Sequence, residues 1–448
     1  MNQHRPALVY AEATSVLGEY DHKLSFAASQ DHAIIYGPNG VGKTKFLEII
    51  HAMHRFDGRT LSSIPFNDAT LRYEDGTKLH VGSSPDDVSR IGEKRRSRRI
   101  LRFSLTLAGQ TTETWDTSAD TTFDHWLLEN TPWRPSAGDL WEDFRDGETL
   151  TLEELATIYP EAVDMAMPLP RALGRFRSDA RSYLIETQRL RIENDVERIR
   201  SLGGRPNPRR KHNSKIVEHS GKMRSLVNDA QTEHSAITQQ LDRTFPHRVL
   251  ERATPPNRPS EVRDRYEQQN EFRSRLGRVA SVELAEALSL PDRAFDESEL
   301  RLLTIYLDDT QQKLAPFELL LHKIELFEAI VNTRLLRKKL RVTAKDGLLV
   351  RHATEDRSID LDSLSSGEQH EIILMFDLLF NVPPGALVMI DEPEISLHVV
   401  WQLAFIPDVQ RIAELGGFRF IVATHSPQII NDSWDRATPL GPEEARFV

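Results

Sequence analysis

The sequence contains no cysteine. Without thiols the chain can form no disulfide, no iron–sulfur cluster and no zinc site with thiolate ligands. The lack of cysteine suits a reducing compartment, and we expect a cytoplasmic protein. No stretch approaches the run of about 18 apolar residues that a membrane span needs, and the first residues lack the apolar core of a signal peptide. The sequence therefore predicts a protein that works without a membrane partner.

An excess of positive charge is also lacking. The 448 residues carry a formal net charge of -11 at pH 7. This balance argues against a generally basic nucleic-acid coat protein, although it leaves room for a local basic patch. The length allows two or three domain-sized units and a sizeable buried core.

One stretch fits the phosphate-binding pattern G-x-x-x-x-G-K-[ST], and it lies between an apolar run suited to a buried strand and a segment with helical spacing. Its residues are Gly37, Pro38, Asn39, Gly40, Val41, Gly42, Lys43 and Thr44. The glycines let backbone N–H groups approach phosphate oxygens closely, and the start of the helix adds a favourable dipole. We expect Lys43 to reach the β- and γ-phosphates of ATP and Thr44 to bind Mg²⁺.

Two further apolar strands end in polar residues that can act on a nucleotide. The stretch "LVMIDEPE" places Asp391 and Glu392 at the end of one strand. In an open parallel sheet the ligand lies at the carboxyl ends of the strands, so Asp391 would help to hold the metal and Glu392 would orient or deprotonate water. The stretch "ATHSP" ends a second strand at His425, which could bond a γ-phosphate oxygen.

Two weaker signals lie elsewhere in the chain. Gln188 follows an apolar stretch and could contact the metal or water, or could be an ordinary polar residue beside a helix. The turn "LSSGEQH" contains Ser365, Ser366, Gly367 and Glu368. A serine there could simply cap the following helix, whereas the exposed N–H groups of a Ser–Gly helix start also suit an anion.

The middle of the chain is helical and charged. Two series of apolar residues recur at steps of three and four, from Met223 to Leu241 and from Phe317 to Leu335. They predict either a helical bundle or an antiparallel coiled-coil hairpin, with proline-containing breaks near Pro206, Pro246 and Pro255. Patterns of β type bracket this middle, so we expect an α/β head built from both ends of the chain.

The predicted division has three parts. Residues 1–185 form the first part of the head, with a β-rich region and an insertion of short helices between 111 and 180. Residues 186–340 form a helical or short coiled-coil insertion, and residues 341–448 complete the head. Two basic runs, 93–102 and 205–215, are candidates for DNA contact or for an ordinary solvated surface.

Together these motifs resemble ABC-type P-loop ATPases, and within them the SMC-like and OLD-like AAA ATPases of bacterial antiphage systems. The resemblance covers residues 16–55, 183–190 and 341–432, and the stretch 237–250 also looks like a segment of these ATPases. It implies a Q-loop at Gln188, a signature sequence from Leu364 to Gln369, a Walker B pair at Asp391 and Glu392, and a switch histidine at His425. It also implies a D-loop at Ser396–His398, although this sequence lacks the commoner leucine–aspartate pair there.

The resemblance implies a homodimer or higher oligomer in which the signature of one protomer covers ATP and Mg²⁺ bound by the phosphate loop of another. Septu-type and PARIS-type ATPases are the nearest models, so we expect a sensor or regulatory subunit that controls a separate effector, a nuclease. The alternative is a DNA repair or recombination ATPase of the SMC/RecF-like class. The absence of cysteine excludes a zinc-hook repair ATPase, and the large helical middle argues against a transporter motor. We see no nuclease motif, and the intact Lys43, Asp391 and Glu392 argue against a scaffold that never turns ATP over.

Overall fold

The computed structural model describes most of the 448 residues. The described ranges are 7–26, 30–85, 99–107, 112–116, 120–136, 140–145, 147, 149–151, 155, 158–159, 162, 169–186, 214–251, 258–280, 289–355 and 357–442. The chain divides into two compact units. The first contains residues 1–210 and 381–448, and the second contains residues 211–380. The head expected from the sequence is therefore assembled from both ends of the chain.

The first unit contains a six-stranded antiparallel sheet in the order β2-β1-β4-β5-β6-β7. Its strands are β1 (Leu8–Val16), β2 (Tyr20–Ser25), β4 (Asp68–Tyr73), β5 (Lys78–Pro85), β6 (Arg99–Thr106) and β7 (Thr112–Asp116). Short alternating apolar pieces between Asp57 and about Leu107 predict antiparallel strands, and the structure confirms β4, β5 and β6 there. The strands β1, β2 and β7 lie outside that stretch.

A five-stranded sheet, in the order β11-β15-β16-β3-β17, carries the motif residues. Its strands are β3 (His32–Tyr36), β11 (Ser182–Glu186), β15 (Leu387–Asp391), β16 (Arg419–Thr424) and β17 (Ala437–Pro439). Every neighbouring pair is parallel. The carboxyl ends of all five strands therefore meet at one edge. The three residues of β17 carry no periodic signal, and the sequence analysis missed this strand.

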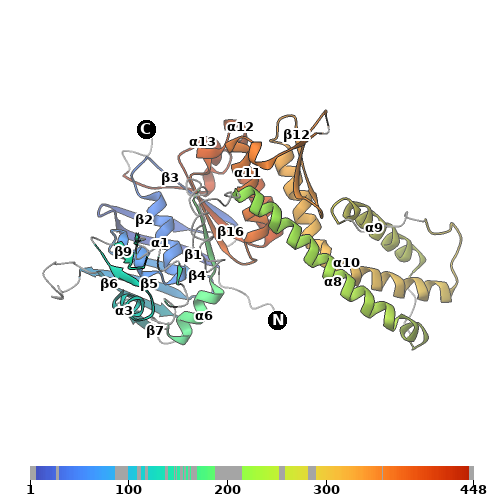
Figure 1. Cartoon of the computed structure of the whole chain (residues 1–448), viewed down its shortest axis with the longest axis horizontal. Coiled ribbons are helices and arrows are strands. Elements are labelled where there is room, and N and C mark those ends of the chain that lie inside the picture. The colour runs from blue at the N-terminus through green and yellow to red at the C-terminus, as the bar shows by residue number, and fades with distance from the viewer. Residues whose placement is uncertain are drawn as a thin grey trace. The chain divides into compact units, whose positions relative to one another are not determined.

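Both faces of the parallel sheet are buried, as the near-continuous apolar runs require. On one face Ile35, Met389 and Ile421 join a core that also contains residues of α1 (Lys43–Arg55) and of the antiparallel sheet. Figure 1 shows α1 beside the strands of this unit. On the other face Gln410, from α12 (Val399–Gly416), contacts His32. The unit also contains α2 (Gly58–Ser63), α6 (Arg171–Asp179) and α13 (Pro427–Ile430), with short 3-10 turns at Pro393–Ser396 and Trp434–Arg436.

The segment expected to hold short helices also forms strands. A small sheet in the order β10-β9-β8 consists of β8 (Trp133–Pro135), β9 (Leu140–Asp143) and β10 (Thr149–Thr151), and it accompanies α3 (Asp120–Asn130). Phe123, Trp133 and Trp141 form part of a separate buried core there. The expectation of helices alone was incomplete, because strands of three or four residues are too short to show alternation.

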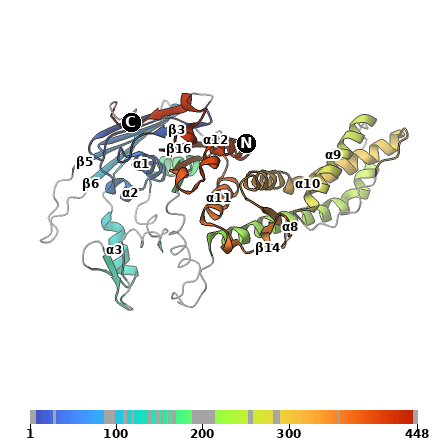
Figure 2. The same cartoon turned by 90° about the horizontal axis from the view of Figure 1, so that it is seen from above.

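The second unit contains three long helices, α8 (Lys215–Glu251), α9 (Pro259–Gly277) and α10 (Glu297–Asn332) (Figure 2). The ring of His234 in α8 bonds the carbonyl of Lys313, whereas Arg248, further along α8, pairs with Asp309, which lies earlier in α10. These two helices therefore run antiparallel. Arg265 of α9 also pairs with α10. The long helices described in this unit are thus three that pack together, rather than a simple two-helix hairpin.

The break expected near Pro246 was wrong, because α8 continues through Pro246 to Glu251. A proline inside a helix removes one backbone hydrogen bond and crowds the preceding turn. Arg248 lies just beyond it and is held by Asp309 through an Nη2–Oδ2 contact of 2.7 Å. We attribute the continued helix to this tertiary contact. Pro206 and Pro255 lie outside the described residues.

The second unit also contains a three-stranded sheet and the signature-like helix. The sheet consists of β12 (Lys338–Thr343), β13 (Gly347–His352) and β14 (Ser358–Ile359), and α11 (Ser366–Phe376) follows a 3-10 turn at Leu361–Ser363 and leads into a π-helical segment, Asp377–Asn381. These elements pack with α8 and α10, so the compact unit extends to Phe380. The division at 185/186 and 340/341 stays a prediction about functional domains.

Among the described residues, no helix combines the length and apolar character needed to cross a membrane.

Candidate functional site

The phosphate-loop residues connect β3 to α1 as the sequence predicted. A side chain at Gly37 would place its Cβ 2.4 Å from the carbonyl oxygen of Leu440, so only glycine fits there. Gly42, the residue before the helix, has φ of 88°, which is a left-handed conformation that glycine adopts without strain. The loop thus has the close backbone approach that a phosphate cradle requires.

Lys43 lies at the first position of α1, and only 5% of it is exposed. Its Nζ donates hydrogen bonds to the carbonyl oxygens of Gly37 (3.0 Å) and Pro38 (3.2 Å). Burial lowers the pKa of Lys43, while the carboxylates Glu392, Asp391 and Glu394 act in the opposite direction. The amine is therefore held at the loop by carbonyl acceptors in a field of nearby acids.

Thr44 and Asp391 meet although they are far apart in the sequence. The Thr44 hydroxyl donates a hydrogen bond of 2.8 Å to Oδ2 of Asp391. Asp391 is the last residue of β15, and only 8% of it is exposed. Since hydroxyl and carboxylate oxygens are ligands that Mg²⁺ accepts, this pair fits a magnesium site, and the glycine loop beside it fits a nucleotide phosphate.

Glu392 has an unusual backbone conformation. Its φ is 47° and its ψ is 54°, in the left-handed region that non-glycine residues seldom adopt. Its N–H donates a hydrogen bond of 2.8 Å to the carbonyl oxygen of Ala423, which fixes the turn against the neighbouring strand. Such strain persists only where the surroundings impose it, and it is often found at functional sites.

The ring of His425 lies between Lys43 and Glu392. Its Nε2 is 2.5 Å from Nζ of Lys43 and 3.4 Å from Oε1 of Glu392. Burial lowers the pKa of His425, and repulsion by Lys43 lowers it further, whereas Glu392 and Glu394 oppose the shift. The ring is therefore mostly neutral at pH 7 and can accept a hydrogen bond from the lysine. The structure thus brings together Lys43, Thr44, Asp391, Glu392 and His425.

The comparisons with known proteins agree with this geometry. Residues 33–431 match a family model described as "AAA domain, putative AbiEii toxin, Type IV TA system". The chain belongs to this AAA domain family. It is therefore a P-loop ATPase of the AAA class, and the expected α/β ATPase fold with a helical insertion is confirmed.

Solved structures also resemble this AAA protein. The crystal structure of the Smc head domain with an extended coiled coil, bound to the C-terminal domain of ScpA, from Pyrococcus furiosus, is 14% identical, over 95% of this chain and 91% of that chain, with a TM-score of 0.34. The SMC head domain from Thermotoga maritima is 10% identical, over 96% of this chain and 92% of that chain, with a TM-score of 0.34. At such scores we draw no argument from them. No curated protein matches this sequence.

The second unit of the AAA protein contains the signature-like turn. The hydroxyl of Ser365 caps α11 by accepting the N–H of Glu368 (3.3 Å), and Glu368 in turn accepts the N–H of Ser365 (2.9 Å). Burial alone would raise the pKa of Glu368, but hydrogen bonds from Lys338 and Ser365 outweigh it, and the pKa is lowered. Ser366 is exposed and Gly367 is partly exposed. The role of this turn toward a nucleotide stays a prediction.

Other residues expected at the site lie wholly or partly outside the described ranges. Gln188 is not among the described residues, although β11, which precedes it, ends beside Asp391. In the basic run 93–102 only residues 99–102 are described, and Arg102 pairs with Asp116 at 2.8 Å. Of the run 205–215 only the last two residues are described. DNA contact by these runs stays a prediction.

Several polar residues around His425 were not predicted from the sequence. Glu394 accepts the backbone N–H of His425, and Gln402 and Ser426 share a hydrogen bond nearby. The available signal was the third acid of "DEPE", two residues after Glu392. In the expected D-loop, His398 caps α12 by accepting the N–H of Val400 at 3.4 Å.

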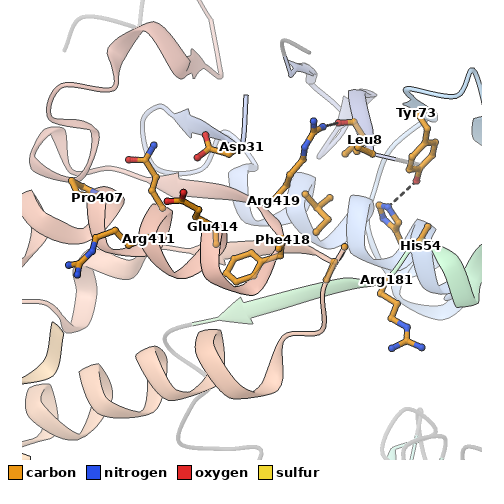
Figure 3. Close-up of a pocket in the computed structure, with 18 residues that line it drawn as sticks. Leu8, Asp31, His54, Tyr73, Arg181, Pro407, Arg411, Glu414, Phe418 and Arg419 are labelled. Carbon is orange, nitrogen blue, oxygen red and sulfur yellow. Dashed lines mark hydrogen bonds between the residues drawn. The ribbon is translucent and has the colours of Figure 1, made fainter. Parts of the chain in front are cut away.

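A cavity of about 680 Å³ lies at the opposite edge of the parallel sheet (Figure 3). It is lined by residues at the amino ends of the strands, such as Asp31, Arg181 and Arg419. Arg419 pairs with Glu74 at 2.9 Å. The cavity is separate from the phosphate loop, and we assign it no ligand.

Proposed function

We propose that this AAA protein binds ATP with Mg²⁺ at the carboxyl edge of its parallel sheet and hydrolyses it. The observation that carries the proposal is the hydrogen bond between Thr44 and Asp391, with Lys43 and His425 in contact beside it. These groups come from distant parts of the sequence and meet at the phosphate loop, which a purely structural role does not account for. A bound Mg²⁺ would neutralise phosphate charge.

The residues would divide the work as follows. Lys43 would leave the carbonyl groups of Gly37 and Pro38 for the phosphate oxygens, which are stronger acceptors because they are charged. His425 would donate to the γ-phosphate from its neutral ring. Glu392 would orient the attacking water and take its proton as the water oxygen bonds to the γ-phosphorus and the bond to ADP breaks.

The test of hydrolysis is Glu392→Gln. The amide keeps the shape but cannot take a proton, so we expect kcat to fall by about 100-fold or more. ATP affinity should stay within about twofold, because the phosphate and metal ligands remain. Steady-state turnover and nucleotide-binding titrations measure the two quantities.

The control is Glu414→Gln, which changes an exposed carboxylate of α12 at the opposite edge of the sheet. Normal turnover in Glu392→Gln would contradict the role of Glu392. The absence of Mg²⁺-dependent turnover in the wild-type protein would contradict the proposed function itself.

We also propose that ATP turnover serves regulation. In this proposal the chain is the sensor subunit of an antiphage defence complex and controls a separate nuclease effector. Two observations support it: the motif resemblance to defence ATPases, and a family description that names a toxin of a toxin–antitoxin system, which is an arrangement of two components.

Co-expression with the protein of the adjacent reading frame tests the regulatory role. We expect the two proteins to co-purify, and we expect phage protection to require both proteins and to be lost in Glu392→Gln. A lone protein whose ATP turnover is stimulated by DNA, and which gives no protection, would instead favour the DNA repair alternative.

A further inference from the structure

Two side chains from a single segment form hydrogen bonds with the loop that contains His425. Oε1 of Glu394 accepts the backbone N–H of His425 at 2.6 Å. The hydroxyl of Ser426 donates to Oε1 of Gln402 at 2.6 Å. Glu394 belongs to the turn that follows β15, and Gln402 lies in the first turns of α12. Hydrogen bonds from one neighbouring segment thus hold the histidine loop at two successive residues, His425 and Ser426.

Gln402 is itself fixed by the backbone around it. Only 8% of the residue is exposed, and its Nε2 donates to the carbonyl oxygen of Leu397 at 3.1 Å. Its oxygen is then aimed at Ser426, which is also 8% exposed. A buried amide with both ends bonded has little freedom, because breaking either bond leaves a polar group unsatisfied.

The second carboxylate oxygen of Glu394 indicates a role beyond stabilising the turn in which Glu394 lies. Oε2 is buried and has no hydrogen-bond partner among the described residues. A buried carboxylate oxygen without a donor is unfavourable for folding. The charge of Glu394 acts on Lys43 and on His425, both of which lie at the phosphate loop. Glu394 therefore combines a hydrogen bond to the His425 backbone with a charge that acts on the residues at the phosphate loop.

We propose that Glu394 and Gln402 are positioning residues for ATP hydrolysis, holding the backbone at His425 and Ser426 so that the His425 ring stays between Lys43 and Glu392. The inference rests on the proposed function, because it needs His425 to act on the nucleotide. Neither residue touches the reacting atoms. Loss of either lets the loop shift, and small displacements of a reacting group lower the rate strongly.

The experiment compares Glu394→Ala, Glu394→Gln and Gln402→Ala in the full chain. Without an acceptor at position 394 we expect kcat to fall about 10- to 100-fold, while the KM for ATP changes less than about threefold. Glu394→Gln keeps an oxygen that can accept the His425 N–H, so it should recover most of the lost rate. Gln402→Ala should show the same split between kcat and KM as Glu394→Ala.

A double-mutant cycle with His425→Ala separates positioning from a direct role. If Glu394 acts through the His425 ring, adding Glu394→Ala to His425→Ala should change the single-turnover rate by less than about twofold. Glu414→Ala serves as the matched control for loss of a carboxylate and should behave as wild type.

Several results would overturn the inference. Wild-type kcat in both Glu394→Ala and Gln402→Ala would do so, as would a full loss of rate that persists in the His425→Ala background. If Glu394→Ala does not fold, Glu394→Gln and Gln402→Ala carry the test, and a Gln402→Ala variant with normal kcat then decides against it. Failure of the proposed function is distinguishable, because in that case the wild-type protein itself would not hydrolyse ATP.

Discussion

Thr44 shows how much a single side chain can contribute at this site. It is separated from Asp391 by 347 positions in the sequence, yet the hydroxyl and the carboxylate are hydrogen bonded at 2.8 Å. The contact exists because Thr44 lies in the first turn of α1, which follows β3, Asp391 ends β15, and β16 lies between the two strands in the sheet. The two oxygens thereby lie together where the proposed Mg²⁺ site requires them.

We predict that Thr44→Val weakens the affinity of the site for Mg²⁺. Valine has nearly the same shape but no hydroxyl, so one oxygen ligand and its bond to Asp391 are lost. The Mg²⁺ concentration needed for half-maximal turnover should rise by at least about tenfold. A magnesium titration of ATP turnover measures this, with Thr44→Ser, which keeps the hydroxyl, as the control. An unchanged titration curve in Thr44→Val would rule out the assigned role.

At the level of elements, two neighbouring serines at the start of α11 have different surroundings. Ser365 and Glu368 form a reciprocal capping box, and Lys338 holds the carboxylate of Glu368 at 2.7 Å. Ser366 is exposed at the first position of the helix. The structure therefore places the cap at Ser365 and leaves Ser366 exposed, and the role of Ser366 toward the nucleotide of a partner stays a prediction.

We predict that Ser365→Ala loosens the first turn of α11 while Ser366→Ala does not. Loss of an N-cap hydroxyl usually costs about 1 kcal/mol. Native-state hydrogen exchange should show the opening free energy of the first α11 amides reduced by roughly that amount in Ser365→Ala. The Ser366→Ala variant should stay within about 0.5 kcal/mol of wild type. Equal exchange in the two variants would contradict the separate roles.

At the level of the whole molecule, the phosphate loop and the signature-like turn belong to different compact units of the chain. The first unit holds the phosphate loop, Asp391, Glu392 and His425, and the second holds Ser366 and Gly367. The resemblance to ABC-type ATPases implies that the signature of one protomer covers ATP bound by its partner. Oligomers of this kind are usually closed and symmetric, so a homodimer would contain two composite sites.

We predict that two inactive variants restore activity when mixed. Lys43→Ala disables the phosphate loop of its own protomer, and Ser366→Arg blocks the signature offered to a neighbour. With random exchange half of the dimers are mixed and each has one intact site of two, so turnover should recover to about 25% of wild type if the sites act independently.

Subunit exchange and ATP trapping are measured alongside turnover, because strict coupling between sites could suppress turnover in a mixed dimer. A site closed within one protomer predicts no recovery, since every protomer carries one defect. If exchange is verified and neither turnover nor trapped ATP appears, the composite site is wrong.

Most of the residues that meet at the carboxyl edge of the parallel sheet could be predicted from the sequence. Lys43, Asp391 and His425 each follow or end an apolar run, and ligands of a parallel sheet lie at the carboxyl ends of its strands. Glu394 and Gln402 could not be predicted in the same way, because their partners are backbone and hydroxyl groups of a loop that has no pattern of its own. The short strands β8, β9, β10 and β17 were not predicted, because three or four residues are too few to show an alternating pattern.

The sequence by itself determined the motifs of this protein: which residues are candidates to cradle a phosphate, hold a metal and activate water, and that both ends of the chain contribute to the head. Local patterns suffice for this, because glycine spacing and apolar periodicity act over a few residues. Only the tertiary structure decided which of these side chains touch, that α8 continues through Pro246, and that Glu394 holds His425. Those outcomes depend on contacts between residues far apart in the chain, where packing outweighs local preference.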